Sequence, residues 1–145
     1  MTEQNRRCYS KKHAGKEIFI DEKFREHLLE EAKEGALICT RALLIAKELG
    51  IDPQQAGIYL DLLEVRIAEC QLGLFGFTPV KRLVKKAETI DPAMRQLIEE
   101  AMENDCVPCE SLLKIANSCN VSPMTLAGIC EALDIHIKPC QLGAF

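Results

Sequence analysis

The sequence contains no tryptophan, and two tyrosines and five phenylalanines supply all its aromatic side chains. It has no apolar run near the roughly 18–20 residues that a membrane-spanning helix needs, and its first residues lack the apolar core of a signal peptide. We therefore expect a cytoplasmic protein with no membrane partner. Gly-rich phosphate loops and nucleophile-elbow motifs are also missing, and no carboxylate pair stands out, so we expect no enzyme.

Positive charge is scarce overall but concentrated in two segments. Lys and Arg number 18 against 22 Asp and Glu, and the formal net charge of −4 argues against general attraction to nucleic acid. The basic residues of the first segment are Arg6, Arg7, Lys11, Lys12 and Lys16, and those of the second are Lys81, Arg82, Lys85 and Lys86. Each segment could form a local basic surface or could simply be solvated.

What the chain does have is a repeat. The segment CQLGLF at residues 70–75 returns almost unchanged as CQLGAF at residues 140–145. An offset of about 70 residues, with no gap, aligns far more identical positions than chance predicts. Among them are Lys11 with Lys81, Asp21 with Asp91, Cys39 with Cys109, Ala46 with Ala116 and Pro53 with Pro123. We predict a tandem duplication, with a first repeat over residues 1–75 and a second over residues 76–145.

The length of 145 residues suits one ordinary domain or two very small ones. A unit of about 70 residues is only marginally stable alone, so we expect the repeats to pack together as an intramolecular pseudo-dimer. The chain would then be a monomer or would form a homodimer. The CQLG motif is expected to end each repeat and to dock onto its own repeat or the other one.

Apolar residues at helical spacing predict three helices in each repeat. They span about 22–34, 38–49 and 53–63 in the first repeat, and about 92–104, 108–119 and 123–133 in the second. Capping residues precede several of them, namely Asp21, Asp52, Asp91 and Ser122. Short stretches at 17–20, 65–67 and 135–137 are strand candidates that could form a ribbon from the ends of a repeat. The fold class is therefore mainly α, with two tandem three-helix units.

Residues 45–59, IAKELGIDPQQAGIY, resemble the helix-turn-helix of DNA-binding regulators. Ala46 is small where the two helices would touch, Gly50 suits a sharp turn, and Ile51 is apolar. The second repeat offers Ala116, Asn120 and Val121 at the same places. The resemblance covers about 20 residues per copy. It implies a DNA-binding or regulatory protein whose third helix lies in the major groove.

The resemblance makes double-stranded DNA the expected partner and implies two sets of contacts. The residues that would face the bases are Gln54, Gln55, Ile58, Met124 and Thr125. The residues that would contact phosphates are Lys11, Lys12, Lys16, Lys81, Arg82, Lys85 and Lys86, with Arg41 and Lys47 in addition. The third-helix faces carry no Arg or Lys, and Asp61 and Glu131 on them would repel phosphate. The alternative is therefore a module that binds a protein partner on the same scaffold.

Eight cysteines are many for a cytoplasmic chain of this size, because thiols there are normally reduced. Cys39 and Cys109 fall in the first turns of predicted helices, and Cys70 and Cys140 open the repeated motif. These four could meet between the repeats as a tetrahedral metal site. Cys106 completes a C-x-x-C with Cys109, a spacing found in metal ribbons and redox centres. The cysteines could therefore pack in the core, bind a metal or carry out redox chemistry. The only cofactor that the sequence suggests is a metal ion bound by cysteines.

Overall fold

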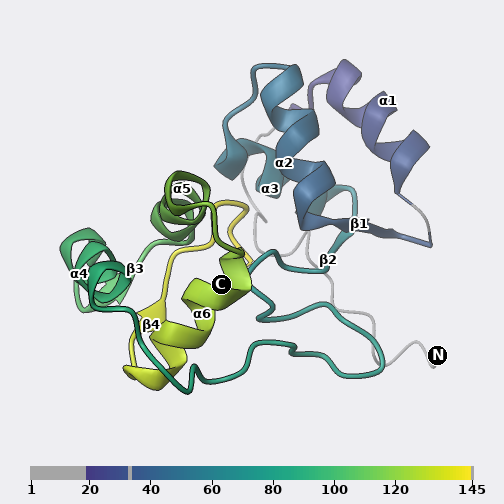
Figure 1. Cartoon of the computed structure of the whole chain (residues 1–145). Helices are drawn as coiled ribbons and strands as arrows, with labels where there is room; N and C mark the ends of the chain where they lie inside the picture. The colour runs from purple at the N-terminus through teal and green to yellow at the C-terminus, as the bar shows by residue number, and fades with distance from the viewer. Residues whose placement is uncertain (1–18, 33, 145) are drawn as a thin grey trace.

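The computed structural model describes residues 19–32 and 34–144. Of the described residues 49% are helical, which confirms the mainly α class. The N-terminal half contains α1 (Glu22–Glu31), β1 (Ala36–Ile38), α2 (Cys39–Glu48), α3 (Pro53–Leu62) and β2 (Arg66–Ala68). The C-terminal half contains α4 (Pro92–Ala101), β3 (Cys106–Val107), α5 (Cys109–Cys119), α6 (Pro123–Ala132) and β4 (His136–Ile137). The order of elements is thus the same in both halves (Figure 1). Within the described residues, no helix is long and apolar enough to cross a membrane.

Helix starts follow the predicted caps. The side chains of Asp21, Asp52, Asp91 and Ser122 each accept a hydrogen bond from a backbone N–H in the first turn of the helix that follows. The turn between α2 and α3 is closed by a hydrogen bond of 2.8 Å from Ile51 N–H to the Ala46 carbonyl. The equivalent bond in the C-terminal half, from Val121 N–H to the Ala116 carbonyl, measures 3.0 Å. Both halves therefore contain the bihelical turn that the sequence predicts.

The small sheets differ from the expected ribbons. β1 pairs in parallel with β2, with Leu37 opposite Ile67, and β3 pairs in parallel with β4. The strand expected at residues 17–20 is not the partner: residues 17 and 18 lie outside the described residues, and Phe19 and Ile20 belong to no strand. A parallel pair needs a long crossover, and the α2–α3 hairpin supplies it. The first predicted helix is also shorter than expected, because it ends at Glu31 to leave room for β1.

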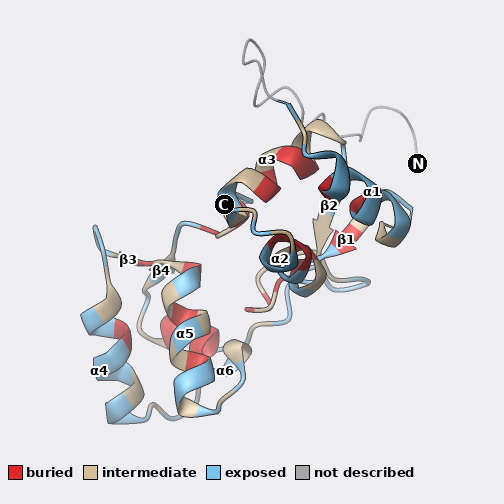
Figure 2. Cartoon of the chain, turned by 90° about the horizontal axis from the view of Figure 1, so that it is seen from above, coloured by how far each residue is buried: buried red, intermediate tan, exposed pale blue. Residues whose placement is uncertain are grey.

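Two hydrophobic cores organise the packing, one in each half. The largest buried side chains of the first core are Phe24, Leu28, Ile45 and Leu60, and those of the second are Ile98, Leu112 and Leu126. Buried faces of α2, α3 and α5 are turned toward the interior in Figure 2. Each core, however, also contains residues from the other half of the chain.

The residues that cross over belong to the repeated motif. The first CQLG loop (residues 70–73) places Cys70 and Leu72 in the core of the C-terminal half. The second CQLG loop (residues 140–143) places Cys140 and Leu142 in the core of the N-terminal half. Accordingly, the second CQLG loop lies beside α3 in Figure 2, where Leu142 meets Gly57. The two halves therefore exchange their motif loops and form one interlocked unit.

Both CQLG loops make the same tight turn. The N–H of Gly73 donates to the Cys70 carbonyl at 2.9 Å, and the N–H of Gly143 donates to the Cys140 carbonyl at 3.0 Å. The φ angles of the two glycines are 75° and 74°, a left-handed conformation that most residues adopt only with strain. This requirement explains why the motif keeps its glycine.

The second CQLG loop packs directly against the backbone of α3. A Cβ atom added at Gly57 would lie only 1.9 Å from the Leu142 carbonyl oxygen. On α6, a Cβ at Gly128 would lie 2.5 Å from the Lys85 carbonyl oxygen, where residues 82–87 cross the helix. Ala87 N–H also donates to the Gly128 carbonyl at 3.0 Å. Both helices thus use a glycine to admit another segment at backbone distance.

The substitution Gly57→Ala should destabilise the protein by about 1–3 kcal/mol, the usual cost of overpacking, because the new methyl group displaces the second CQLG loop. The loss should occur even though alanine favours a helix over glycine by about 1 kcal/mol. Urea unfolding followed by circular dichroism measures it. Gln54→Ala on the exposed face of α3 is the control and should leave stability within about 0.5 kcal/mol. A Gly57→Ala protein as stable as the wild type would contradict the packing described here.

Candidate functional site

Four cysteines lie at the carboxyl ends of the parallel strands. Cys39 directly follows β1, and Cys70 follows β2 after one intervening residue. Because β1 and β2 are parallel, both strands deliver their next residues to the same edge of the sheet. The C-terminal half repeats this arrangement with Cys109 after β3 and Cys140 after β4. Each half therefore presents two thiols at one edge.

The exchange of the CQLG loops brings the two edges together. Cys140 shares a core with Cys39, and Cys70 shares a core with Cys109. The N–H of Cys109 also donates to the Pro139 carbonyl at 3.0 Å, which places the second loop against the start of α5. Every pair among the four thiols is close enough for electrostatic repulsion between thiolates. We call this group, Cys39, Cys70, Cys109 and Cys140, the four-cysteine site.

Backbone N–H groups point at the sulfur atoms of this site. Gln71 N–H donates to the Cys39 sulfur, and Gln141 N–H donates to the Cys109 sulfur. The Cys70 sulfur accepts from the N–H groups of its own loop, at Leu72, Leu74 and Phe75. Such donors stabilise a thiolate and strengthen its use as a ligand.

Burial nevertheless favours the protonated thiol at Cys39, Cys70 and Cys109, because it raises the pKa of each. The four residues are only 4–5% exposed. Burial raises the pKa of Cys39 to about 11 and that of Cys109 to about 12, since it outweighs the N–H donors, and it raises the pKa of Cys70 as well. A metal bound here would have to displace these protons. Among the described residues, no set of three or more His, Cys, Asp or Glu side chains is arranged to hold a metal ion as it stands.

The remaining described cysteines lie elsewhere. Cys130 is buried in the core of the C-terminal half, where burial raises its pKa to about 11, and it fits the packing role. Cys119 is half-buried at the end of α5. Cys106 lies on β3 opposite His136, so the C-x-x-C motif contributes Cys109 alone to the four-cysteine site. Cys8 falls outside the described residues.

The residues expected to face DNA bases are divided by burial. Gln54 and Thr125 are exposed in the first turns of α3 and α6, whereas Gln55, Ile58 and Met124 are half-buried. Met124 lies against the first CQLG loop, because a Cβ at Gly73 would be 3.1 Å from its sulfur. Part of the expected reading face of α6 is thus occupied by the exchange.

The residues expected to contact phosphate lie beside α6 or outside the described residues. Lys81, Arg82, Lys85 and Lys86 are exposed on the segment that crosses α6, and Arg82 forms an ion pair with Glu131. Lys11, Lys12 and Lys16 belong to residues 1–18, which the structure does not describe. Arg41 is engaged by Glu31, with its Nε 2.9 Å from the carboxylate.

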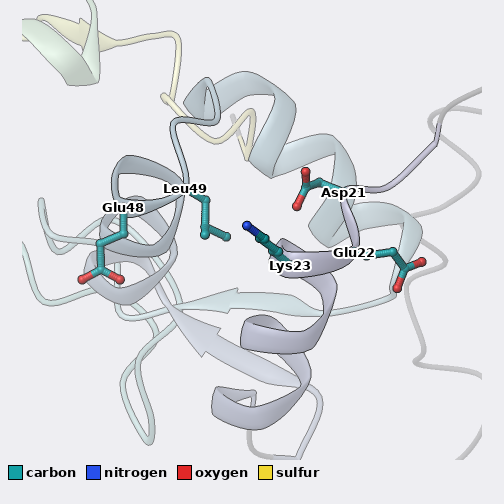
Figure 3. A pocket seen from close by; sticks show the side chains of 5 residues that line it. All are labelled: Asp21, Glu22, Lys23, Glu48 and Leu49. Carbon is teal, nitrogen blue, oxygen red and sulfur yellow. The ribbon is translucent and has the colours of Figure 1, made fainter.

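A surface hollow between the start of α1 and the end of α2 offers no comparable chemistry. It is lined by Asp21, Glu22, Lys23, Glu48 and Leu49 (Figure 3). The carboxylate of Asp21 already caps α1 by accepting from Phe24 N–H at 3.0 Å. No thiol or imidazole lines this hollow.

No protein-family model, curated protein or solved structure matches this chain. Its function must therefore be inferred from its residues. The recurrence of four cysteines at equivalent positions was the sequence signal for the site, and the structure brings all four together. The N–H donors of Gln71 and Gln141 were not expected, although their place next to the motif cysteines could have suggested them.

Glu31→Gln should cause a small loss of stability that depends on pH. The hydrogen bond from Arg41 holds the pKa of Glu31 below its ordinary value of 4.5. A lowered folded-state pKa contributes stability above the ordinary value and loses it as the pH falls through the lowered one. Urea midpoints of wild type and variant should therefore differ at neutral pH and converge in acid. Glu30→Gln is the control for removal of a charge, and a difference that persists in acid would contradict the pair's role.

Proposed function

We propose that this chain is a non-enzymatic regulatory protein whose two repeats are fixed by a metal centre at the four-cysteine site. The observation that carries the proposal is the convergence of four thiols, two from each half, in one buried place. No polar or charged side chain outside the cysteines and Tyr59 is buried among the described residues, and four of the five buried thiols belong to this site. Thiols gathered in this way are typical ligands of soft or borderline metals.

The tandem duplication is part of the same proposal. The repeated sequence, the repeated order of elements and the exchanged loops all support an intramolecular pseudo-dimer. Its approximate two-fold axis would then pass through the four-cysteine site. A metal held by both repeats couples binding to folding, because its ligands come together only when the repeats are docked. Gain or loss of the metal would therefore set the relative position of α3 and α6.

Elemental analysis of anaerobically purified protein tests the metal centre. We expect bound metal in the wild type and in Cys119→Ser, whose thiol lies outside the site. Cys70→Ser and Cys140→Ser should lose most of it, because each removes one ligand. The metal-bound protein should also unfold at a higher temperature than the chelated protein. Wild-type protein free of metal, with the same stability before and after chelation, would refute the proposal.

DNA binding is a second candidate function. Gln54 and Thr125 are exposed in the first turns of α3 and α6, the part of a recognition helix that reads bases in helix-turn-helix proteins. Exposed Lys81, Lys85 and Lys86 lie on the segment that crosses α6 and could contact phosphates. A metal centre that fixes α3 relative to α6 would then make DNA affinity depend on the metal.

Fluorescence anisotropy with a mixed-sequence duplex at low salt tests this candidate. We expect micromolar binding that weakens as salt rises, because lysines release counterions from phosphate. The double substitution Lys85→Ala and Lys86→Ala should weaken binding several-fold and flatten the salt dependence. Lys114→Ala on α5 removes an exposed lysine away from this segment and should change little. If no duplex binds at micromolar protein, or if salt has no effect, the candidate fails.

A further inference from the structure

We infer that the centre at the four-cysteine site is an iron–sulfur cluster rather than a single zinc ion. This inference rests on the proposed function, because it names the cofactor class of the same site. Four features of the site support it: the spacing of the thiols in space, their spacing in sequence, the charge of the surroundings and the apolar cover.

The spacing of the thiols in space suits a centre larger than one ion. A tetrahedral zinc site with Zn–S bonds of about 2.3 Å holds its sulfurs about 3.8 Å apart. In the four-cysteine site every pair of thiols interacts electrostatically, yet no three of them form a ligand group for one ion. An iron–sulfur cluster inserts several irons and sulfides between its four thiolates, and it therefore spans a wider gap.

The spacing of the ligands in sequence also departs from structural zinc sites. Zinc ribbons and fingers usually take two ligands from one short C-x2–4-C turn, and many iron–sulfur proteins use similarly short spacings, so the spacing here is unusual for either centre. Here each ligand comes from a separate position, at residues 39, 70, 109 and 140. The one C-x-x-C motif contributes Cys109, while Cys106 lies on β3. A single thiol from each of four segments can surround a bulky centre from all sides.

The lack of positive charge around the site favours a centre whose negative charge is spread over a larger volume. Four thiolates around one Zn²⁺, or around an oxidised iron–sulfur core of charge about +2, carry the same net charge of about −2. No buried cationic side chain among the described residues offsets it. A larger centre distributes this charge over more volume, which lowers the cost of removing it from water. The N–H groups of Gln71, Gln141 and residues 72–75 then supply the hydrogen bonds to sulfur that stabilise and tune such clusters.

The apolar cover of the site protects such a cluster from water. Leu72 is fully buried and Leu142 is 2% exposed, and each lies two residues after a ligand cysteine. Transfer of a preassembled cluster from a thiolate donor would move one proton from each of the four cysteines to the departing donor thiolates. No iron changes its oxidation state in this exchange of ligands. The step needs only the cluster donor.

The test is the composition of anaerobically purified protein from cells supplied with both iron and zinc. We expect iron and acid-labile sulfide in equal amounts, about two to four of each per chain, together with sulfide-to-iron charge-transfer absorption in the visible. Cys70→Ser and Cys140→Ser should lose most of the iron and sulfide, while the control variants Cys106→Ser and Cys119→Ser should retain them. Far-ultraviolet circular dichroism checks that each variant is folded.

A measurement on the wild type keeps the test decisive if a variant fails to fold. Alkylation followed by peptide mass spectrometry should show the four site cysteines protected in the loaded protein and labelled after the cluster is removed in denaturant. Cys119 should be labelled in both. One zinc per chain, lost on changing Cys70 or Cys140, would overturn the iron–sulfur assignment but support the metal centre. No metal in native or reconstituted protein would overturn both.

Discussion

The reciprocal insertion of Leu72 and Leu142 is the interaction on which the rest of the structure depends. Each leucine is buried in the core of the half to which it does not belong in sequence. Burial of one such side chain contributes about 1.5–3 kcal/mol, a large share of the stability of a half with about 70 residues. Without the insertion each core would lose its leucine and would expose apolar surface where the partner loop now lies.

The chemistry of the site follows from the same insertion. Cys70 and Cys140 precede the two leucines by two residues, so the packing of the leucines fixes where these thiols lie. Cys39 and Cys109 are held from the other side by β1 and β3, which lead directly into α2 and α5. The packing of the two leucines and the positions of the four thiols therefore cannot change independently. A cofactor bound there would stabilise both cores at once.

Local chemistry made the helices predictable, because caps and apolar spacing act within a few residues. Asp21, Asp52, Asp91 and Ser122 start helices where the sequence indicates. The convergence of four cysteines could also be anticipated, since the cysteines recur in sequence at the same offset in both halves, whose elements follow the same order. The exchange of loops could not be anticipated, because an apolar residue such as Leu72 could be buried equally well in the core of its own half or in that of the other half. The strand at Ala36–Ile38 was missed because three apolar residues before a helix carry no periodicity.

The apolar periodicity of the sequence also did not indicate that residues 82–87 cross over α6. Gly128, on the same helix as the expected reading residues Met124 and Thr125, is buried under the backbone of Lys85. Exposure of Gln54 and Thr125, by contrast, agrees with their place in the first helical turn. Sequence periodicity identifies which face of a helix is apolar. It does not identify which other segment of the chain covers a helix face made of polar or small residues.

The exchange of loops also sets the order of events during synthesis. Leu142 leaves the ribosome after every residue of the N-terminal half, whose core it completes. That half cannot reach its final packing before residues 140–143 have been made. The core of the N-terminal half is therefore complete only after Cys140 and Leu142 have been made. The two halves should therefore complete their packing together rather than one after the other.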